Sequence, residues 1–166
     1  MVDTIDKVTR SAVMARVRSE DTGPELRLRR ALFAHGFRYR LHNRQLPGTP
    51  DLVLAKYGAV VFVHGCFWHW HGCRRSRLPA TNAEYWTAKI ERNCARDRKS
   101  VRELRERGWR ILVVWECALA ARLVDKTASI AVNWLCEHKS PGVWCIEPIL
   151  AADGTRPSPR LRECIF

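Results

Sequence analysis

The segment from His64 to Cys73 limits the possible folds of this chain more than any other part of the sequence. It contains three His, two Cys and three aromatic residues within ten positions. Zinc prefers four thiolate or imidazole ligands in a tetrahedron, and these two side-chain types are rarely this dense by chance. The loop therefore indicates a metal site, and the fold must bring at least one further ligand to it from another segment.

Three ligands of the predicted zinc site come from this loop, namely Cys66, His71 and Cys73. We expect Cys117 to be the fourth, because it ends a predicted strand and strand ends on one side of a sheet can converge on one loop. A closed site of three thiolates and one imidazole is structural, since no position is left for chemistry. Two alternatives stay open: the loop cysteines can be ordinary small buried residues, and spacing does not decide between His69 and His71.

Cysteine content and charge indicate the compartment and the partner. The 166 residues include seven Cys, an odd number and too few for a disulfide scaffold, which favours reduced thiols or metal ligands. The net charge of +12 is carried mostly by Arg, whose guanidinium matches phosphate geometry. Nucleic acid is therefore the leading partner, with a solvated basic surface as the alternative. No apolar stretch approaches the roughly 18 residues that cross a bilayer, so we expect a soluble, intracellular protein with no membrane contact.

Hydrophobic periodicity and turn residues predict an α/β fold in which helices flank a sheet. Pro and Gly are frequent after residue 139, where no further element is predicted. The predicted elements are helices at 11–17, 21–35, 81–107 and through 131–135, and strands at 37–41, 51–55, 59–63 and 109–115, with 51–55 and 59–63 forming an antiparallel hairpin.

Asp51 opens a buried strand directly after a Pro-Gly-Thr-Pro loop. A hairpin turn centred on Tyr57 would place positions 51 and 63 opposite each other, with the carboxylate of Asp51 beside the backbone of Val63. A nuclease needs such a carboxylate to hold Mg²⁺ near the scissile phosphate, and His64 and His69 at the strand end can transfer protons. The alternative for Asp51 is a structural role at the end of a turn.

Two further carboxylates have structural and functional explanations that both stay open. Glu25 lies in the first turn of a predicted helix, where its charge is favourable near the helix dipole. Asp97 falls on the apolar stripe of the long helix, which is costly unless another group satisfies it. We expect Asp97 to accept a hydrogen bond from a zinc-bound imidazole, or else to pair with a helix arginine.

Phe67, Trp68 and Trp70 lie together in the loop that a metal would brace. Each alone is most simply a core residue. Together, beside a cationic surface, they suit insertion between base pairs, which costs a few kcal/mol per unstacked step. Trp86, one turn into the long helix, can stand beside them.

Four groups of residues form a recognisable pattern along the chain. They are Asp6-Lys7 with Thr9-Arg10-Ser11, Leu46-Pro47-Gly48 with Pro50-Asp51, His64-Gly65-Cys66-Phe67-Trp68-His69 with Cys73, and Trp109-Arg110 with Val114-Trp115-Glu116-Cys117. This pattern resembles the very-short-patch-repair (Vsr) mismatch endonucleases from about residue 5 to about residue 136. It is most specific in the Cys/His loop.

The resemblance implies a restriction-endonuclease-like fold of the PD-(D/E)xK type, a mixed sheet flanked by helices with a structural zinc site. It implies a Mg²⁺-dependent, strand-specific endonuclease that acts on T:G mispairs left when 5-methylcytosine deaminates. The enzyme nicks 5′ to the mispaired T and leaves a 5′-phosphate. The expected partners are mismatched double-stranded DNA and a MutL-type mismatch-repair mediator, for a monomer in the cytoplasm that associates with the nucleoid.

The resemblance also implies catalytic roles. Asp51 would ligate Mg²⁺ and His69 would act as general base. Glu25 and His64 would assist at the phosphate. We expect the backbone carbonyl of Val63 to be a further Mg²⁺ ligand, so that Val in place of the family's Thr leaves the site intact.

The other implied residues form two sets, and the chain divides into three parts. The structural zinc ligands are Cys66, His71, Cys73 and Cys117, and the residues that enter the DNA are Phe67, Trp68, Trp86 and Met14. The three parts are an N-terminal DNA-contacting arm or helix (1–20), an endonuclease domain (21–138) and a C-terminal tail of uncertain order (139–166). Two rival functions stay open: a zinc-stabilised DNA-binding module without catalysis, and a restriction-type endonuclease that cuts intact duplex.

Overall fold

A six-stranded mixed sheet is the centre of the fold in the computed structural model, which describes residues 20–137, 140–149 and 157–164. The described helices and strands are α2 (Gly23–Ala34), β1 (Arg40–Leu41), β2 (Leu52–Leu54), β3 (Ala59–His64), α3 (Ala83–Glu106), β4 (Arg110–Trp115), α4 (Val124–Glu137), β5 (Val143–Ile149) and β6 (Ser158–Glu163). Strand order in the sheet follows chain order. The pairs β1–β2, β2–β3 and β5–β6 are antiparallel, and β3–β4 and β4–β5 are parallel.

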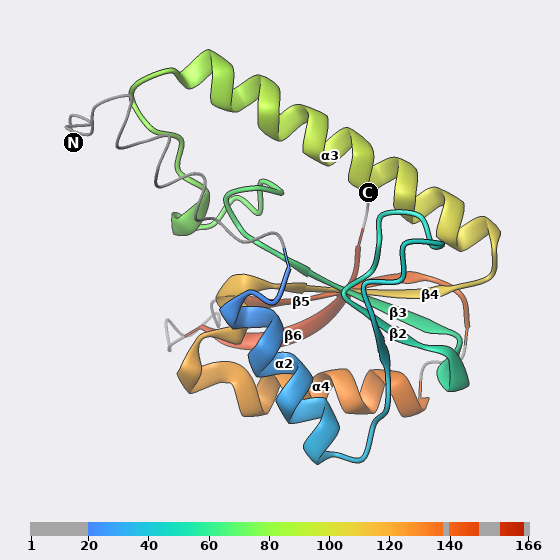
Figure 1. The fold of residues 1–166 in the computed structure, drawn as a ribbon. Helices are drawn as coiled ribbons and strands as arrows, with labels where there is room; N and C mark the ends of the chain where they lie inside the picture. Colours follow the sequence, from blue (N-terminus) through green and yellow to red (C-terminus); the bar gives the residue numbers. More distant parts are fainter. Residues whose placement is uncertain (1–19, 138–139, 150–156, 165–166) are drawn as a thin grey trace.

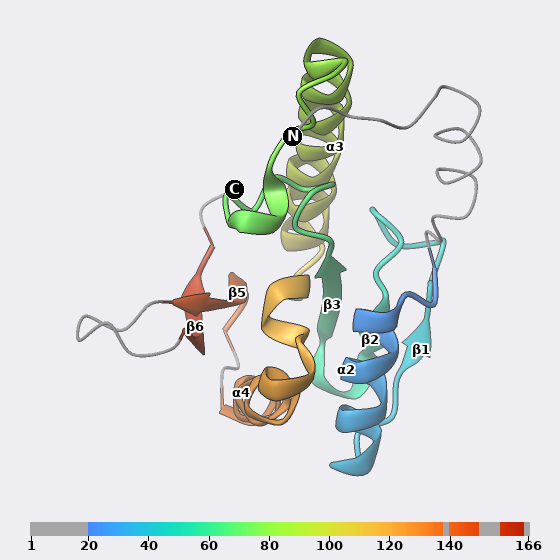
Figure 2. The same ribbon diagram turned by 90° about the vertical axis from the view of Figure 1, so that its left-hand side faces the viewer.

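Helices cover both faces of this sheet, which confirms the predicted α/β arrangement. α3 crosses above it, and α2 and α4 pack below it (Figure 1). A view turned by 90° places β1 and β6 at opposite edges (Figure 2). None of the helices in the described part of the chain is both long and apolar enough to cross a membrane.

Two hydrophobic clusters, one on each face, explain why the central strands are apolar without alternation. In β4, Leu112 and Val114 belong to the cluster shared with α2 and α4, whereas Ile111 and Val113 belong to the cluster under α3. All four are fully buried. A strand that is covered on both sides has no polar face, so its sequence shows a continuous apolar run.

The predicted hairpin of β2 and β3 is confirmed, but its register differs by one residue. Leu52 pairs with Val61 and Leu54 with Ala59, so position 51 aligns with 62 rather than 63. The cause is the turn, because residues 55–57 form a short 3-10 helix and Gly58 closes it with a left-handed φ of 57°. The chain therefore turns about a point between residues 56 and 57, not about Tyr57.

The predicted end of the domain near residue 138 is wrong, because β5 and β6 join the same sheet. β5 pairs with β4, and its residues Val143, Cys145 and Ile146 are buried. Pro148 and Pro159 face each other in the β5–β6 pair. Proline is tolerated at a sheet edge, but it conceals a strand pattern in the sequence. The predicted helix at 11–17, with Met14, lies outside the described residues.

We expect Ile146→Ala to destabilise the whole domain, because Ile146 is fully buried opposite Val114 of β4. Loss of a buried Ile side chain costs about 2–5 kcal/mol in the free energy of unfolding, which urea titration measures. Leu41→Ala is the control, since Leu41 is 44% exposed on edge strand β1 and its loss should cost under about 0.5 kcal/mol. Equal losses in the two variants would show that β5 does not belong to the core.

Candidate active site and metal centre

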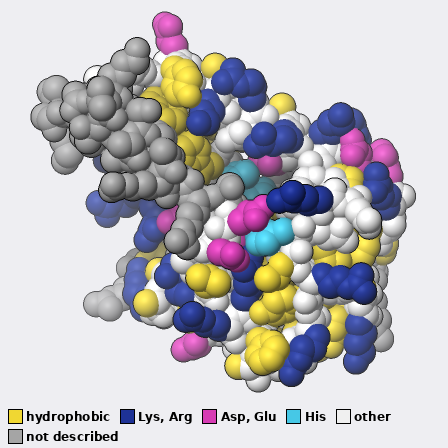
Figure 3. All heavy atoms as spheres, in the orientation of Figure 1, with side chains coloured by type: hydrophobic (Ala, Val, Ile, Leu, Met, Phe, Trp, Pro, Cys, Tyr) yellow, Lys and Arg dark blue, Asp and Glu magenta, His cyan; other side chains and the backbone are white. Residues whose placement is uncertain are grey.

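A cleft of about 960 Å³ lies between the start of α2, the end of β3 and the middle of α3. Acidic and histidine side chains gather in its centre, and Lys and Arg side chains surround them on this face (Figure 3). The predicted catalytic residues all line this cleft: Glu25, Asp51, Val63, His64 and His69. Segments that are far apart in the sequence therefore meet at one surface.

Asp51 contacts the backbone of Val63, as the sequence predicts despite the shift in register. The Val63 N–H donates to Oδ2 of Asp51 over 2.7 Å. Burial raises the pKa of Asp51 to about 6, the hydrogen bond from Val63 acts in the opposite direction, and the charge of Glu25 raises it further. Within the described ranges, no cationic side chain forms an ion pair with Asp51. A partly buried carboxylate oxygen without an ion-pair partner fits a site for a hard cation such as Mg²⁺.

His69 is held by Asp97, which projects from the middle of α3. Nδ1 of His69 lies 2.5 Å from Oδ2 of Asp97. Burial alone would raise the pKa of Asp97, but the hydrogen bond with His69 and nearby positive charges lower it overall. An ionised carboxylate only accepts hydrogen bonds, so Nδ1 carries a proton, and in the neutral form of the ring Nε2 keeps its lone pair. His69 is thus arranged to accept a proton at Nε2.

His64 packs flat against His69 at the end of β3. The two rings are 3.9 Å apart between centroids, with an angle of 8° between their planes. Burial is the main cause that lowers the pKa of His64 to about 3, and the charge of His69 adds to it. His64 is therefore neutral near pH 7. Its buried Nδ1 has no hydrogen-bond partner among the described residues.

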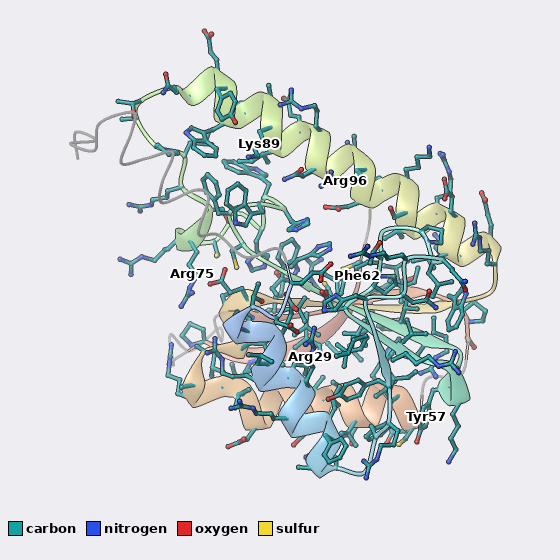
Figure 4. All side chains as sticks on the ribbon, viewed as in Figure 1. Arg29, Tyr57, Phe62, Arg75, Lys89 and Arg96 are labelled. Carbon is teal, nitrogen blue, oxygen red and sulfur yellow. The ribbon has the colours of Figure 1, made fainter. Side chains whose placement is uncertain are left out.

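Both carboxylate oxygens of Glu25 accept hydrogen bonds from neighbouring residues. Its Oε1 accepts a hydrogen bond from the Thr22 hydroxyl over 2.8 Å. Its Oε2 accepts from Arg29 over 2.9 Å and from the Asp21 N–H over 3.0 Å. Arg29 itself lies between α2 and the sheet (Figure 4). Glu25 thus fixes the start of α2 beside Asp51, and its assistance at the phosphate stays a prediction.

The four predicted zinc ligands, Cys66, His71, Cys73 and Cys117, form one cluster. Their ligand atoms all lie within 4.8 Å of one another. A hydrogen bond from Cys117 is the main cause that lowers the pKa of Cys66 to about 4, which favours the thiolate that a metal requires. Three thiols and one imidazole at this spacing are a donor set that suits tetrahedral zinc.

The cluster of these four Cys and His residues is built by the parallel pairing of β3 with β4. His64 pairs with Trp115 at the ends of these strands, so Cys66 and Cys117 each lie two residues beyond a paired position. Spacing alone does not choose between the two loop histidines. In the structure His71 joins the thiols, with Nδ1 3.4 Å from the sulfur of Cys117, and His69 lies in the cleft.

The expectation that Asp97 supports a zinc ligand is wrong, because Asp97 contacts His69, which does not belong to the cluster. The carboxylate on His71 is Glu147 of β5, with Oε2 2.5 Å from Nε2. Sequence reasoning missed Glu147, since it lies beyond the predicted end of the domain. The available signal was the alternation of Val143, Cys145 and Glu147 on one face of a possible strand.

The predicted wedge residues Phe67, Trp68 and Trp86 meet at one end of the cleft. Their ring centroids are 5.0 Å apart for Phe67–Trp68, 5.4 Å for Phe67–Trp86 and 6.1 Å for Trp68–Trp86. Lys89 extends from α3 toward them, with its ammonium 5.1 Å from the Trp68 centroid (Figure 4). Trp70 does not join them and is 48% exposed. Insertion of these rings into DNA stays a prediction, and Met14 lies outside the described residues.

Comparisons with known proteins match most of this chain to related sequences. Residues 2–75 match the sequence model of a family described as DNA mismatch endonuclease Vsr. The chain is 44% identical over 139 residues to the DNA mismatch endonuclease Vsr of Escherichia coli (strain K12), covering 82% of this chain and 89% of the relative. It is 48% identical over 120 residues to the type II nicking enzyme V.XorIIP of Xanthomonas oryzae pv. oryzae, with 72% and 88% covered. For the type II nicking enzyme V.NmeAIP of Neisseria meningitidis, identity is 44% over 124 residues, with 75% and 89% covered.

In Mg²⁺-free buffer we expect Asp51→Asn to stabilise the protein above pH 6 and to leave it unchanged near pH 4. The pKa of about 6 in the folded protein lies above the ordinary 3.8, so the stability that the proton on Asp51 contributes is complete below about pH 4. It is lost as pH rises through 6. The full difference corresponds to about 3 kcal/mol, which thermal unfolding between pH 4 and 8 measures.

The control for this measurement is Glu106→Gln at the exposed end of α3. It should change the free energy of unfolding by less than about 0.5 kcal/mol at every pH. A stability curve for Asp51→Asn that runs parallel to that of the parent protein would show that Asp51 carries no burial cost.

Proposed function

Because the chain belongs to the Vsr family of DNA mismatch endonucleases, we propose that it is a Mg²⁺-dependent enzyme that nicks one strand of duplex DNA 5′ to the T of a T:G mispair. Family membership makes the chain a DNA endonuclease. We propose in addition that the enzyme requires Mg²⁺, that it cuts only one strand, and that it recognises a T:G mispair. The observation that carries the proposal is the shared cleft, which brings the partly buried carboxylate of Asp51 together with His69, whose Nδ1 is held by Asp97.

Asp51 and the backbone carbonyl of Val63 are the groups that we propose to hold Mg²⁺. When bound, the ion would orient water and neutralise charge on the scissile phosphate. Asp51 suits this task because its carboxylate is fixed by the Val63 N–H and forms no ion pair among the described residues. Glu25 adds negative charge next to it.

His69 is proposed to take the proton from the attacking water at Nε2. Asp97 supports this role in two ways, since it fixes the ring orientation and stabilises the imidazolium that forms. Neutral His64 supports His69 through the ring stack, and it lines the cleft where it would assist at the phosphate. Attack on phosphorus in line with the 3′ oxygen leaves a 3′-hydroxyl and a 5′-phosphate.

The aromatic cluster is proposed to supply selectivity for the mismatch. Phe67 and Trp68 lie in the same loop as His69, and Trp86 of α3 contacts them. These rings can enter a base step while the phosphate lies over Asp51. A T:G wobble pair is easier to unstack than a Watson–Crick pair, so deformation costs less at a mismatch. The excess of basic residues would hold the phosphate backbone without reading sequence.

The proposal includes a structural zinc held by Cys66, His71, Cys73 and Cys117. The support is their convergence and their chemistry. Zinc there would brace the loop that carries both His69 and the wedge. A MutL-type mediator, a monomeric state and a cytoplasmic location at the nucleoid are proposed from family membership alone.

The function is tested with labelled duplexes that carry either T:G or C:G at the same position, incubated with the protein and Mg²⁺. We expect a single nick 5′ to the mispaired T and no cut in the C:G duplex. Asp51→Asn should lose nicking by at least about a thousandfold and keep DNA binding, because the carboxylate rather than the fold is removed. Cleavage of both strands of the C:G duplex would contradict the mismatch proposal. Binding without a nick under any divalent ion would contradict catalysis.

The zinc centre is tested by Cys117→Ala. We expect the purified variant to lose its equivalent of zinc and to melt at lower temperature, because binding of a structural metal is coupled to folding. Elemental analysis and thermal unfolding measure the two effects. The control is Cys136→Ala, which removes an exposed thiol on α4 and should change neither. Unchanged zinc content in Cys117→Ala would remove Cys117 from the site.

A further inference from the structure

The imidazole of His71 is held from three directions. Nδ1 faces the thiols, 3.4 Å from the sulfur of Cys117. Nε2, on the opposite side of the ring, lies 2.5 Å from Oε2 of Glu147. The ring also stacks on Trp115, with 4.3 Å between centroids and 23° between the planes. These contacts leave the ring little freedom to turn.

Glu147 is anchored in its turn by the last described strand. Arg162 of β6 donates to Oε1 of Glu147, while Oε2 faces His71. The side chains of His71 and Glu147 are only 6% and 13% exposed. A carboxylate this far from water is costly unless its oxygens are paired, and here both are. The pairing therefore couples the β5–β6 hairpin to the loop after β3.

The contact between His71 and Glu147 is the one that a metal-bound imidazole requires. A histidine that ligates through Nδ1 must carry its proton on Nε2, and a carboxylate on Nε2 selects that tautomer and fixes the ring plane. Glu147 is the carboxylate in that position, because Asp97 is taken by His69 on the other side of the loop.

We propose that Glu147 is the positioning residue for the zinc ligand His71, with Arg162 holding Glu147 in place. The inference rests on the zinc centre proposed above and is independent of the nicking reaction. It assigns the C-terminal hairpin a role in the metal centre, beyond its role in the sheet.

The test compares Glu147→Gln with Glu163→Gln, which makes the same change of charge at an exposed position on the same hairpin. Zinc transfer from each folded protein to a coloured chelator gives an apparent zinc affinity. We expect Glu147→Gln to lower that affinity 10- to 100-fold, the range for loss of a carboxylate behind a metal-bound histidine. Glu163→Gln should match the parent within about twofold.

A spectroscopic measurement separates positioning from general destabilisation. In the zinc-bound parent, nitrogen-15 NMR should show His71 protonated at Nε2, with the proton resonance shifted far downfield by the short hydrogen bond to Glu147. Glu147→Gln should move this resonance upfield, whereas Glu163→Gln should leave it in place. Arg162→Ala, which keeps Glu147 but removes its anchor, should lower the zinc affinity by a smaller factor, about threefold to tenfold.

The outcomes are distinguishable. Equal zinc affinity and an unmoved His71 resonance in Glu147→Gln would overturn the inference, even if zinc is present. Absence of zinc from the parent protein would overturn both the inference and the zinc centre, and would leave the nicking proposal standing. If Glu147→Gln does not fold, Arg162→Ala decides, and a zinc affinity equal to that of the parent counts against the role of Glu147.

Discussion

In the parallel pair of β3 and β4, His64 lies opposite Trp115, so the two chains leave the sheet side by side. A parallel pair needs a long crossover, and here α3 supplies it. The loop after β3 thus meets two segments at once: Cys117, just beyond β4, and α3, which passes over the loop with Trp86 and Asp97. The cluster of Cys66, His71, Cys73 and Cys117, the His69–Asp97 contact and the aromatic cluster all follow from this one pairing.

The loop after β3 serves two sites because its backbone reverses between two histidines. Trp70 has a left-handed φ of 53°, a conformation that is uncommon for a bulky residue. His69, before it, lies in the cleft on Asp97, and His71, after it, joins the thiols. Such a backbone conformation persists only where the surrounding structure holds it. A metal bound at the His71 end of the loop would therefore help to hold His69 in position at the other end.

Local patterns in the sequence predicted the parts of this fold that depend on neighbours in the chain. The hairpin followed from two apolar runs around Gly58, and the contact of Asp51 with Val63 followed from the hairpin. The register of the β2–β3 pair could not be predicted, because the 3-10 turn at 55–57 has no distinct sequence signal. The density of His and Cys in one loop was enough to predict three members of the Cys/His cluster, and a predicted strand end gave the fourth, Cys117.

Contacts between distant segments explain what the sequence analysis missed. Glu147 lies 76 positions from His71, in a strand whose neighbouring prolines make the sequence look like an irregular tail. Asp97 was correctly recognised as a carboxylate that needs a partner on the apolar stripe of α3. The predicted partner of Asp97 was a metal-bound imidazole, whereas the actual partner is His69. The two loop histidines are only two positions apart in the sequence, and the backbone conformation at Trp70 directs them to different sites.

The electrostatics of the molecule differ between its whole surface and its cleft, and the difference matters for function. The chain as a whole carries +12, which attracts a polyanion over long range. At the floor of the cleft, however, Asp51 is a partly buried carboxylate with a raised pKa next to the charge of Glu25. A bare phosphate approaching this floor would be repelled, and the floor itself is destabilised. A divalent cation bound there would relieve both effects at once, which would link metal binding to DNA binding.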